Sequence, residues 1–208
     1  TGLGFRSLLV GNEAVVRVEE FDLEGDENTG LHSVYHRLTG MGYHVKVLLP
    51  PFDPILLRKL RDISDLWLAL AHSSEKQFSL GWFEMNYMNS NPVMVVVDQE
   101  GEPVAFANML SEYQKNELTV DLMRHLPDAG HGIMDFLFIS LIQWAKENQY
   151  ETFNLGLSTL SGTVSASDDP VIERAFQYIY RHVNRFYHFK GLHQYKAKFH
   201  PEWSARYL

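Results

Sequence analysis

The segment from Glu117 to Lys146 constrains the fold most, because it joins a strand pattern to a helix pattern through a short loop that contains glycine. Residues 117–124 read Glu-Leu-Thr-Val-Asp-Leu-Met-Arg, an alternation that indicates a half-buried strand. Residues 133–146 form a long apolar run that is typical of a core helix. Backbone amides at a helix N-terminus can hold an anion, so the loop at residues 127–132 predicts an anion-binding point beside the strand end.

Two charged residues of this strand, Asp121 and Arg124, lie three positions apart. A carboxylate can manage a proton, and a guanidinium can hold a phosphate or a carbonyl oxygen through two hydrogen bonds. The pair therefore predicts a group-transfer site at the mouth of the loop. The alternative from spacing alone is a strand-end ion pair that faces water and contributes about 0–1 kcal/mol to stability.

The rest of the chain predicts an α/β protein with a mixed central sheet and flanking helices. Residues 99–102 are expected to form a hairpin turn, residues 158–168 a polar loop, and residues 193–199 an extended tail. No linker separates two parts, so we expect one domain over residues 1–208. The expected strands are residues 13–21, 43–49, 93–98, 104–113, 117–124 and 152–157, and the expected helices are residues 29–41, 54–71, 133–148 and 170–186.

Composition excludes several classes of protein. The 208 residues are 45% hydrophobic and 21% charged, which indicates a folded chain with a large core. A net charge of −8 argues against a general nucleic-acid coat protein. The chain has no cysteine, so disulfides, thiolate catalysis and zinc–thiolate sites are excluded. No apolar run reaches the roughly 18–20 residues that span a bilayer. The chain opens Thr-Gly-Leu-Gly without methionine, so we expect it to be cut from a longer protein.

Several short motifs, in the right order over nearly the whole chain, resemble one family. They are Phe78-Ser79-Leu80-Gly81, Pro92-Val93, Val104-Ala105-Phe106-Ala107-Asn108, Asp121-Leu122-Met123-Arg124, Gly132-Ile133-Met134-Asp135-Phe136-Leu137-Phe138, Phe153-Asn154-Leu155-Gly156, Phe186-Tyr187-His188-Phe189-Lys190-Gly191-Leu192 and Tyr195-Lys196-Ala197-Lys198-Phe199. Together they resemble the C-terminal cytosolic domain of bacterial phosphatidylglycerol lysyltransferases. These enzymes use aminoacyl-tRNA to aminoacylate phosphatidylglycerol.

The resemblance implies a GNAT-like acyltransferase fold, the second of a tandem pair behind a multi-pass membrane segment. It implies that lysyl- or alanyl-tRNA is the donor and that the glycerol hydroxyl of phosphatidylglycerol is the acceptor, with no cofactor. The parent protein would lie in the bacterial inner membrane with this domain on the cytoplasmic face, and would contribute to antimicrobial peptide resistance. One departure stands out: residues 26–28 are Asp-Glu-Asn where the family usually has basic residues. If that segment touches tRNA or anionic lipid, its affinity should be lower here.

The resemblance also implies site residues. Asp121 and Arg124 would be catalytic, because these positions are essential in the family. Lys196 and Lys198 alternate with aromatics, so an extended segment would point both toward one face to hold phosphate; the alternative is a solvated edge strand. Arg185 shares a helix face with Arg181, and a solvated face is the alternative. The full set expected to bind substrate is Ser79, Asn154, Ser158, Arg185, Lys196 and Lys198.

Three other interpretations stay open or are set aside. Gly130 and Gly132 are also compatible with an acetyl-CoA-dependent N-acyltransferase, although Pro127 replaces the basic or amide residue of that motif. A non-catalytic domain that docks lipid or tRNA is a further alternative. His32 and His36 lie four apart on an expected helix, but no acid spacing suggests a third ligand, so no metal site is expected.

Overall fold

The structure is a computed structural model that describes residues 9–70, 83–112, 114–159 and 189–207. The chain divides into two compact units. The larger unit comprises residues 17–154, and the smaller unit comprises residues 1–16 together with residues 155–208. No helix among the described residues has the length and apolar character needed to cross a membrane.

The larger unit is built on a sheet with the strand order β2-β3-β4-β5-β6. The strands are β2 (His44–Leu48), β3 (Val93–Val97), β4 (Pro103–Ser111), β5 (Glu117–His125) and the first residues of β6 (Thr152–Thr159). Strands β2 to β5 pair antiparallel, whereas β5 pairs parallel with β6. The mixed sheet with flanking helices confirms the predicted α/β class, and its order agrees with the GNAT-like fold that the resemblance implies.

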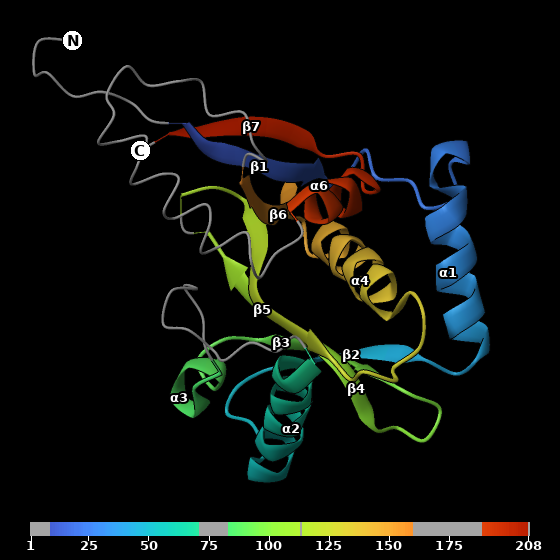
Figure 1. Ribbon diagram of the computed structural model, residues 1–208, viewed down its shortest axis with the longest axis vertical. Helices are drawn as coiled ribbons and strands as arrows, with labels where there is room; N and C mark the ends of the chain where they lie inside the picture. Colours follow the sequence, from blue (N-terminus) through green and yellow to red (C-terminus); the bar gives the residue numbers. More distant parts are fainter. Residues whose placement is uncertain (1–8, 71–82, 113, 160–188, 208) are drawn as a thin grey trace, which may run out of the picture. The chain divides into compact units, whose positions relative to one another are not determined.

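Helices cover both faces of this sheet. α2 (Pro54–Leu70) and α3 (Met85–Met88) lie on one face, and α4 (Ile133–Glu147) lies on the other, where it packs against α1 (Thr29–Gly40) (Figure 1). Every residue of β3 is buried, as expected for a strand covered on both sides. The core on the α2 face consists of Phe52, Leu57, Leu60, Ile63, Phe83, Met88, Val93, Val95, Val97, Phe106 and Leu122.

Among the described residues, the smaller unit contains a two-stranded antiparallel pair, one helix and the later part of β6. β1 (Leu9–Arg17) pairs with β7 (Glu202–Tyr207), and α6 (Phe189–Ala197) precedes β7 in the chain. The predicted extended tail at residues 193–199 is therefore wrong. Residues 193–197 belong to α6, and the buried Phe199 lies in the turn after it, where its N–H donates to the Lys196 carbonyl at 3.1 Å.

Most other elements of the larger unit begin and end close to their predicted positions, but β6 continues to Thr159, so residue 158 lies in a strand rather than in a loop. α3 and β7 were not predicted from the sequence. The predicted helix at residues 170–186 and most of the predicted loop before it lie outside the described residues.

The start of α4 requires a glycine. Gly132, the N-cap of α4, has a φ of +87°, a left-handed conformation that side chains strain. A Cβ at this position would lie 2.6 Å from Cγ1 of Val34 in α1. The neighbouring carbonyl of His131 accepts a hydrogen bond of 2.6 Å from Arg37, also in α1. The loop before α4 and α1 therefore approach each other too closely for any other residue.

We expect Gly132→Ala to lower the free energy of unfolding by about 2–4 kcal/mol, since it adds both backbone strain and overlap with Val34. Gly130→Ala is the matched control, because Gly130 also has a positive φ (+89°) but has no atom within 4 Å of the added Cβ. It should cost only the strain, about 1–2 kcal/mol. Urea unfolding of both variants measures the difference, and equal losses would contradict the close approach.

Candidate functional site

A β-bulge in β5 decides where Asp121 and Arg124 point. Val120 pairs with Met109 and Met123 pairs with Ala107, so β5 has one residue more than β4 between the two pairs. Two residues of β5, Asp121 and Leu122, therefore lie opposite Asn108 alone. In a regular strand, the side chains of two residues three positions apart, such as Asp121 and Arg124, point to opposite faces of the sheet. The extra residue at the bulge shifts this alternation by one, so both side chains point to the same face.

Contacts with the helices confirm this shared face. The Asp121 carboxylate accepts a hydrogen bond of 2.6 Å from the hydroxyl of Tyr87 in α3. The Arg124 guanidinium carbon lies 4.3 Å from the ring centroid of Trp67 in α2. Because α2 and α3 cover the same face of the sheet, the acid and the guanidinium both point toward that face (Figure 1).

The side chain of Asn108 holds the bulge. Its Oδ1 accepts hydrogen bonds from the backbone N–H groups of Asp121 (3.1 Å) and Leu122 (2.7 Å). Its Nδ2 donates to the Tyr87 hydroxyl at 3.3 Å. Asn108 is fully buried, so this amide takes the place of the ladder bonds that the bulge interrupts. The chain Asn108–Tyr87–Asp121 links the bulge directly to the carboxylate.

Tyr87 is a hydrogen-bond donor to Asp121 that keeps its proton. Burial, together with the hydrogen bond to the Asp121 carboxylate, raises the pKa of Tyr87 to about 12. The phenol therefore remains neutral in the physiological range. Its proton lies between the two oxygens and fixes the orientation of the carboxylate.

The anion-binding point predicted at the α4 N-terminus does not coincide with this face. α4 packs on the opposite side of the sheet from α2 and α3 (Figure 1). Asp121 and Arg124 instead contact Tyr87 of α3 and Trp67 of α2. The first turn of α4 carries its own buried acid, Asp135. The expectation that the pair lies at the mouth of this loop is wrong, because the helix crosses to the other face after β5.

Asn154 joins β6 to β5. Its Nδ2 donates to the buried carboxylate of Glu117 at 2.9 Å, and Thr152 donates to the other oxygen of that carboxylate at 3.0 Å. The Asn154 carbonyl accepts a bond of 3.0 Å from the Thr119 hydroxyl. Glu117 is 4% exposed, so these bonds compensate a buried charge. Asn154 thus stabilises the parallel β5–β6 pair, and its role toward substrate stays a prediction.

Lys196 is the buried cation of the smaller unit. The residue is 5% exposed, and its ammonium donates to the carbonyls of Gly156 (2.9 Å) and Leu157 (3.0 Å) in β6. Gly156 has a φ of +81°, which favours glycine where β6 turns its carbonyl to the lysine. Burial lowers the pKa of Lys196 to about 8, and the nearby Glu13 carboxylate partly opposes this.

The remaining predicted residues divide into three groups. Lys198 follows α6, is exposed, and lies with its Nζ 4.8 Å from the Tyr195 ring centroid, so the expectation that it shares a face with Lys196 is wrong. Ser158 is buried within β6 and not in a polar loop. Ser79 and Arg185 lie outside the described residues.

Sequence reasoning missed Trp67, Tyr87 and Asn108. Only Asn108 carried a usable signal, since it is an isolated amide in the otherwise apolar strand segment Val104–Met109. A buried amide within such a strand needs hydrogen-bond partners, and a bulge in the neighbouring strand supplies them. Trp67 and Tyr87 lie on helices whose docking the sequence pattern does not specify.

The whole chain, residues 1–208, matches the protein family described as phosphatidylglycerol lysyltransferase, C-terminal. A phosphatidylglycerol lysyltransferase of Bacillus subtilis (strain 168) is 40% identical over 205 residues, which are 99% of this chain and 24% of that protein. One of Staphylococcus xylosus is 36% identical over 199 residues, 96% of this chain and 23% of that protein. The chain therefore spans about a quarter of the length of these relatives.

A solved structure agrees with the fold over almost all of the chain. The structure of L-PGS from Bacillus licheniformis is 40% identical and superimposes with a TM-score of 0.86. The match covers 98% of this chain and 61% of that one.

We expect Asn108→Ala to lower the free energy of unfolding by about 2–5 kcal/mol, because it leaves two backbone N–H groups at the bulge without their acceptor. Asn116→Ala is the control, since it removes an exposed bond to the Gln149 carbonyl and should cost about 1 kcal/mol or less. Urea unfolding compares them. Similar losses for the two variants would show that the amide of Asn108 does not hold the bulge.

Lys196 also predicts a pH dependence of stability. Its pKa in the folded chain, about 8, lies below the ordinary value of 10.5, so the unfolded chain binds more protons between these pH values. The free energy of unfolding should therefore rise with pH across this window by up to about 3 kcal/mol.

Urea unfolding at several pH values measures this rise as the difference between the unchanged chain and Lys196→Met, which lacks the titrating group. Lys198→Met removes an exposed lysine nearby and should leave the slope unchanged. Parallel pH profiles for the unchanged chain and Lys196→Met would contradict the burial of a charged ammonium.

Proposed function

Since this chain belongs to the family of phosphatidylglycerol lysyltransferase C-terminal domains, we propose that it forms part of an enzyme that transfers a lysyl group to phosphatidylglycerol. The single observation that carries the proposal is the family match over residues 1–208. The shared orientation of Asp121 and Arg124 supplies the chemistry for it. We further propose that the donor is an aminoacyl-tRNA, with lysine or alanine as the amino acid.

The proposed reaction moves the aminoacyl group from the ester of the donor to a new ester with the lipid. The glycerol hydroxyl of the lipid attacks the ester carbonyl of the donor, a new carbon–oxygen bond to the lipid forms, and the bond to the tRNA ribose breaks. The hydroxyl proton ends on the ribose oxygen that leaves. Because the donor ester is already activated, the protein needs mainly to orient the two substrates and to stabilise the oxyanion of the intermediate.

Asp121 is suited to two steps of this reaction. Its carboxylate is aligned by the hydrogen bond from Tyr87, so one oxygen is occupied while the group as a whole keeps a fixed direction. A carboxylate so placed can bind the α-ammonium of the aminoacyl donor, or can accept the proton of the attacking hydroxyl. Both roles use the carboxylate oxygen atoms, and the neutral Tyr87 phenol donates a hydrogen bond to one of them.

Arg124 is suited to hold an anionic oxygen. Stacking on Trp67 fixes the plane of the guanidinium, and one Nη donates to the carbonyl of Met123 at 2.8 Å. A guanidinium has five donors in a planar fork, a geometry that matches a phosphate. We assign to Arg124 the lipid phosphate or the phosphate of the terminal adenosine.

Within the smaller unit, Lys196 is proposed as a phosphate ligand. Its pKa of about 8 lies above 7, so the cation needed for phosphate is retained at neutral pH. Two of its three N–H groups bond the carbonyls of β6, which leaves one direction for a substrate oxygen. The other residues proposed to bind substrate are Asn154, Ser158, Lys198, Ser79 and Arg185.

The parent protein defines where this chemistry would occur. We propose that a membrane segment and a first GNAT-like domain precede this chain in a longer protein, since it spans about a quarter of its relatives. The domain would then work on the cytoplasmic face of the bacterial membrane. The acidic residues Asp26 and Glu27, at the start of η1 (Asp26–Asn28), would weaken contacts with tRNA or anionic lipid in that region.

The test is transfer of radiolabelled lysine from charged tRNA to phosphatidylglycerol vesicles by the full-length parent enzyme. We expect Asp121→Asn to reduce the rate by roughly 100-fold or more, because it removes the ionised acid. Arg124→Lys should reduce it by roughly tenfold or more, since it loses the planar fork and the stacking on Trp67.

Asp128→Asn is the matched control, because Asp128 is an exposed acid in the loop after β5. It should transfer at the unchanged rate. Wild-type product yield from both Asp121→Asn and Arg124→Lys would refute the site. Binding of vesicles without transfer by the unmodified parent enzyme would favour a docking domain, and calorimetric heat with coenzyme A would favour the N-acyltransferase alternative.

A further inference from the structure

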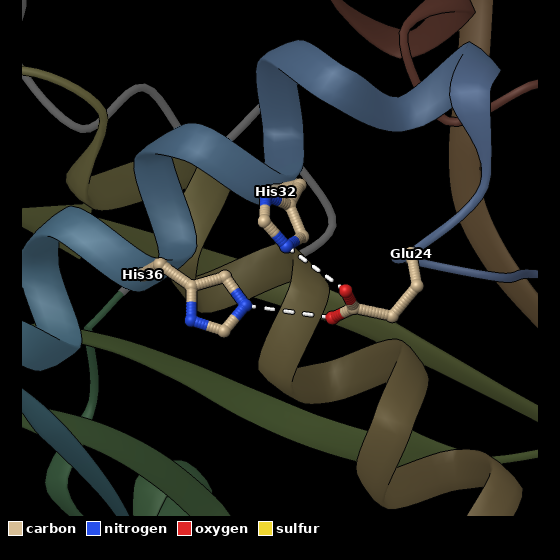
Figure 2. Close-up of side chains that lie close together, drawn as sticks. All are labelled: Glu24, His32 and His36. Carbon is tan, nitrogen blue, oxygen red and sulfur yellow. Dashed lines mark hydrogen bonds and ion pairs between the residues drawn. The ribbon is translucent and has the colours of Figure 1, made fainter.

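A cluster of two imidazoles and one carboxylate lies on α1, away from the residues of the proposed reaction. His32 and His36 are one helical turn apart and share a face, with ring centroids 4.2 Å apart. The carboxylate of Glu24 bridges them: one oxygen lies 2.9 Å from Nε2 of His32 and the other 3.4 Å from Nε2 of His36. Figure 2 shows both Nε2 atoms directed at the same carboxylate.

The turn before α1 brings Glu24 to this position. The Glu24 N–H donates to the Asp22 side chain at 3.0 Å, and the Gly25 N–H donates to the Asp22 carbonyl at 3.2 Å. The buried Asn28 closes the turn through a bond of 2.7 Å to the same carbonyl. These bonds fold the chain back beside the first turns of α1, so the acid that no sequence spacing indicated reaches both histidines.

We propose that Glu24, His32 and His36 form a binding site for a divalent transition-metal ion of the Zn²⁺ class. Their ligand atoms all lie within 4.8 Å of one another. Two ligands of a tetrahedral ion with bonds of 2.0–2.1 Å lie about 3.3 Å apart, so small side-chain rotations close the set around an ion. Two neutral imidazoles and a carboxylate favour Zn²⁺, Co²⁺, Ni²⁺ or Cu²⁺ over Mg²⁺ or Ca²⁺.

The three side chains remain reachable from solvent. They are 68% (Glu24), 38% (His32) and 56% (His36) exposed, so an ion can enter without any rearrangement of the fold. Three protein ligands leave a fourth position for water, as in open zinc sites. The ion replaces the hydrogen-bonded protons that join the imidazoles to Glu24 in the metal-free form.

The bound ion would tie the turn at residues 22–28 to α1. α1 also supplies Val34 and Arg37, which contact the loop before α4. An ion that binds only the folded chain stabilises it by an amount that grows with the logarithm of the ratio of its concentration to its dissociation constant. Metal binding would therefore stabilise the packing of the turn at residues 22–28 against α1, independently of the proposed transferase site.

The test is isothermal titration calorimetry of the tag-free chain with ZnCl₂, together with thermal unfolding in its presence. We expect one ion per chain and a rise in melting temperature. Glu24→Gln, which keeps the size of the side chain but loses the ligating charge, should weaken Zn²⁺ binding by roughly tenfold or more, as should His36→Ala. MgCl₂ should give no heat.

His44→Ala is the matched control, since His44 is an exposed histidine in β2 outside the cluster, and it should bind Zn²⁺ as the unchanged chain does. Absence of heat at millimolar ZnCl₂ would overturn the proposal. Affinity that is unchanged in both Glu24→Gln and His36→Ala would also overturn it, because the ion would then bind elsewhere. Circular dichroism of each variant verifies that it is folded, and all three substituted side chains are exposed enough for that to be expected.

Discussion

The buried amide of Asn108 is the interaction on which the candidate site depends. An extra residue in β5 interrupts the ladder with β4, and two backbone N–H groups lose their strand partners. The Oδ1 of Asn108 accepts both of these bonds, and its Nδ2 orients Tyr87. Without the bulge, the acid and the guanidinium of β5 would face opposite sides of the sheet. With it, both point toward the face covered by α2 and α3.

Two buried charged side chains form hydrogen bonds with β6, one in each compact unit. In the larger unit, the Glu117 carboxylate accepts bonds from Thr152 and Asn154 at the start of the strand. In the smaller unit, the Lys196 ammonium bonds two carbonyls further along the same strand. A buried charge is costly unless hydrogen bonds replace its water. Each of these charges therefore specifies a local backbone arrangement that apolar packing alone would leave open.

Patterning predicted much of the larger unit because its elements are regular. Alternation marked the meander of β3, β4 and β5, and the apolar run after residue 132 marked α4. The tail was misassigned because residues 195–199, in which lysine occupies every second position, mimic a strand, whereas residues 193–197 belong to α6. Where tertiary contacts decide the conformation, local alternation is a weak guide.

The sequence named candidate site residues but did not predict their geometry. The resemblance pointed to Asp121 and Arg124, but only the register of β4 and β5 reveals the bulge between them, and only helix docking reveals Tyr87 and Trp67. The proximity of Glu24 to His32 and His36 was missed for a related reason. Glu24 lies eight residues before His32, in a turn whose path depends on Asp22 and Asn28, so no helical or strand spacing connects the acid to the histidines.

A double-mutant cycle tests most directly whether the bulge lets Asp121 and Arg124 act together on one substrate. The quantity measured is the rate of lysyl transfer by the full-length parent enzyme. The cycle compares Asp121→Asn, Arg124→Ala and the double variant. If the two side chains act together on one substrate, the double variant should be about as slow as the slower single variant. Losses in activation free energy that simply add would mean that the two residues act independently, and would contradict a shared site on this face.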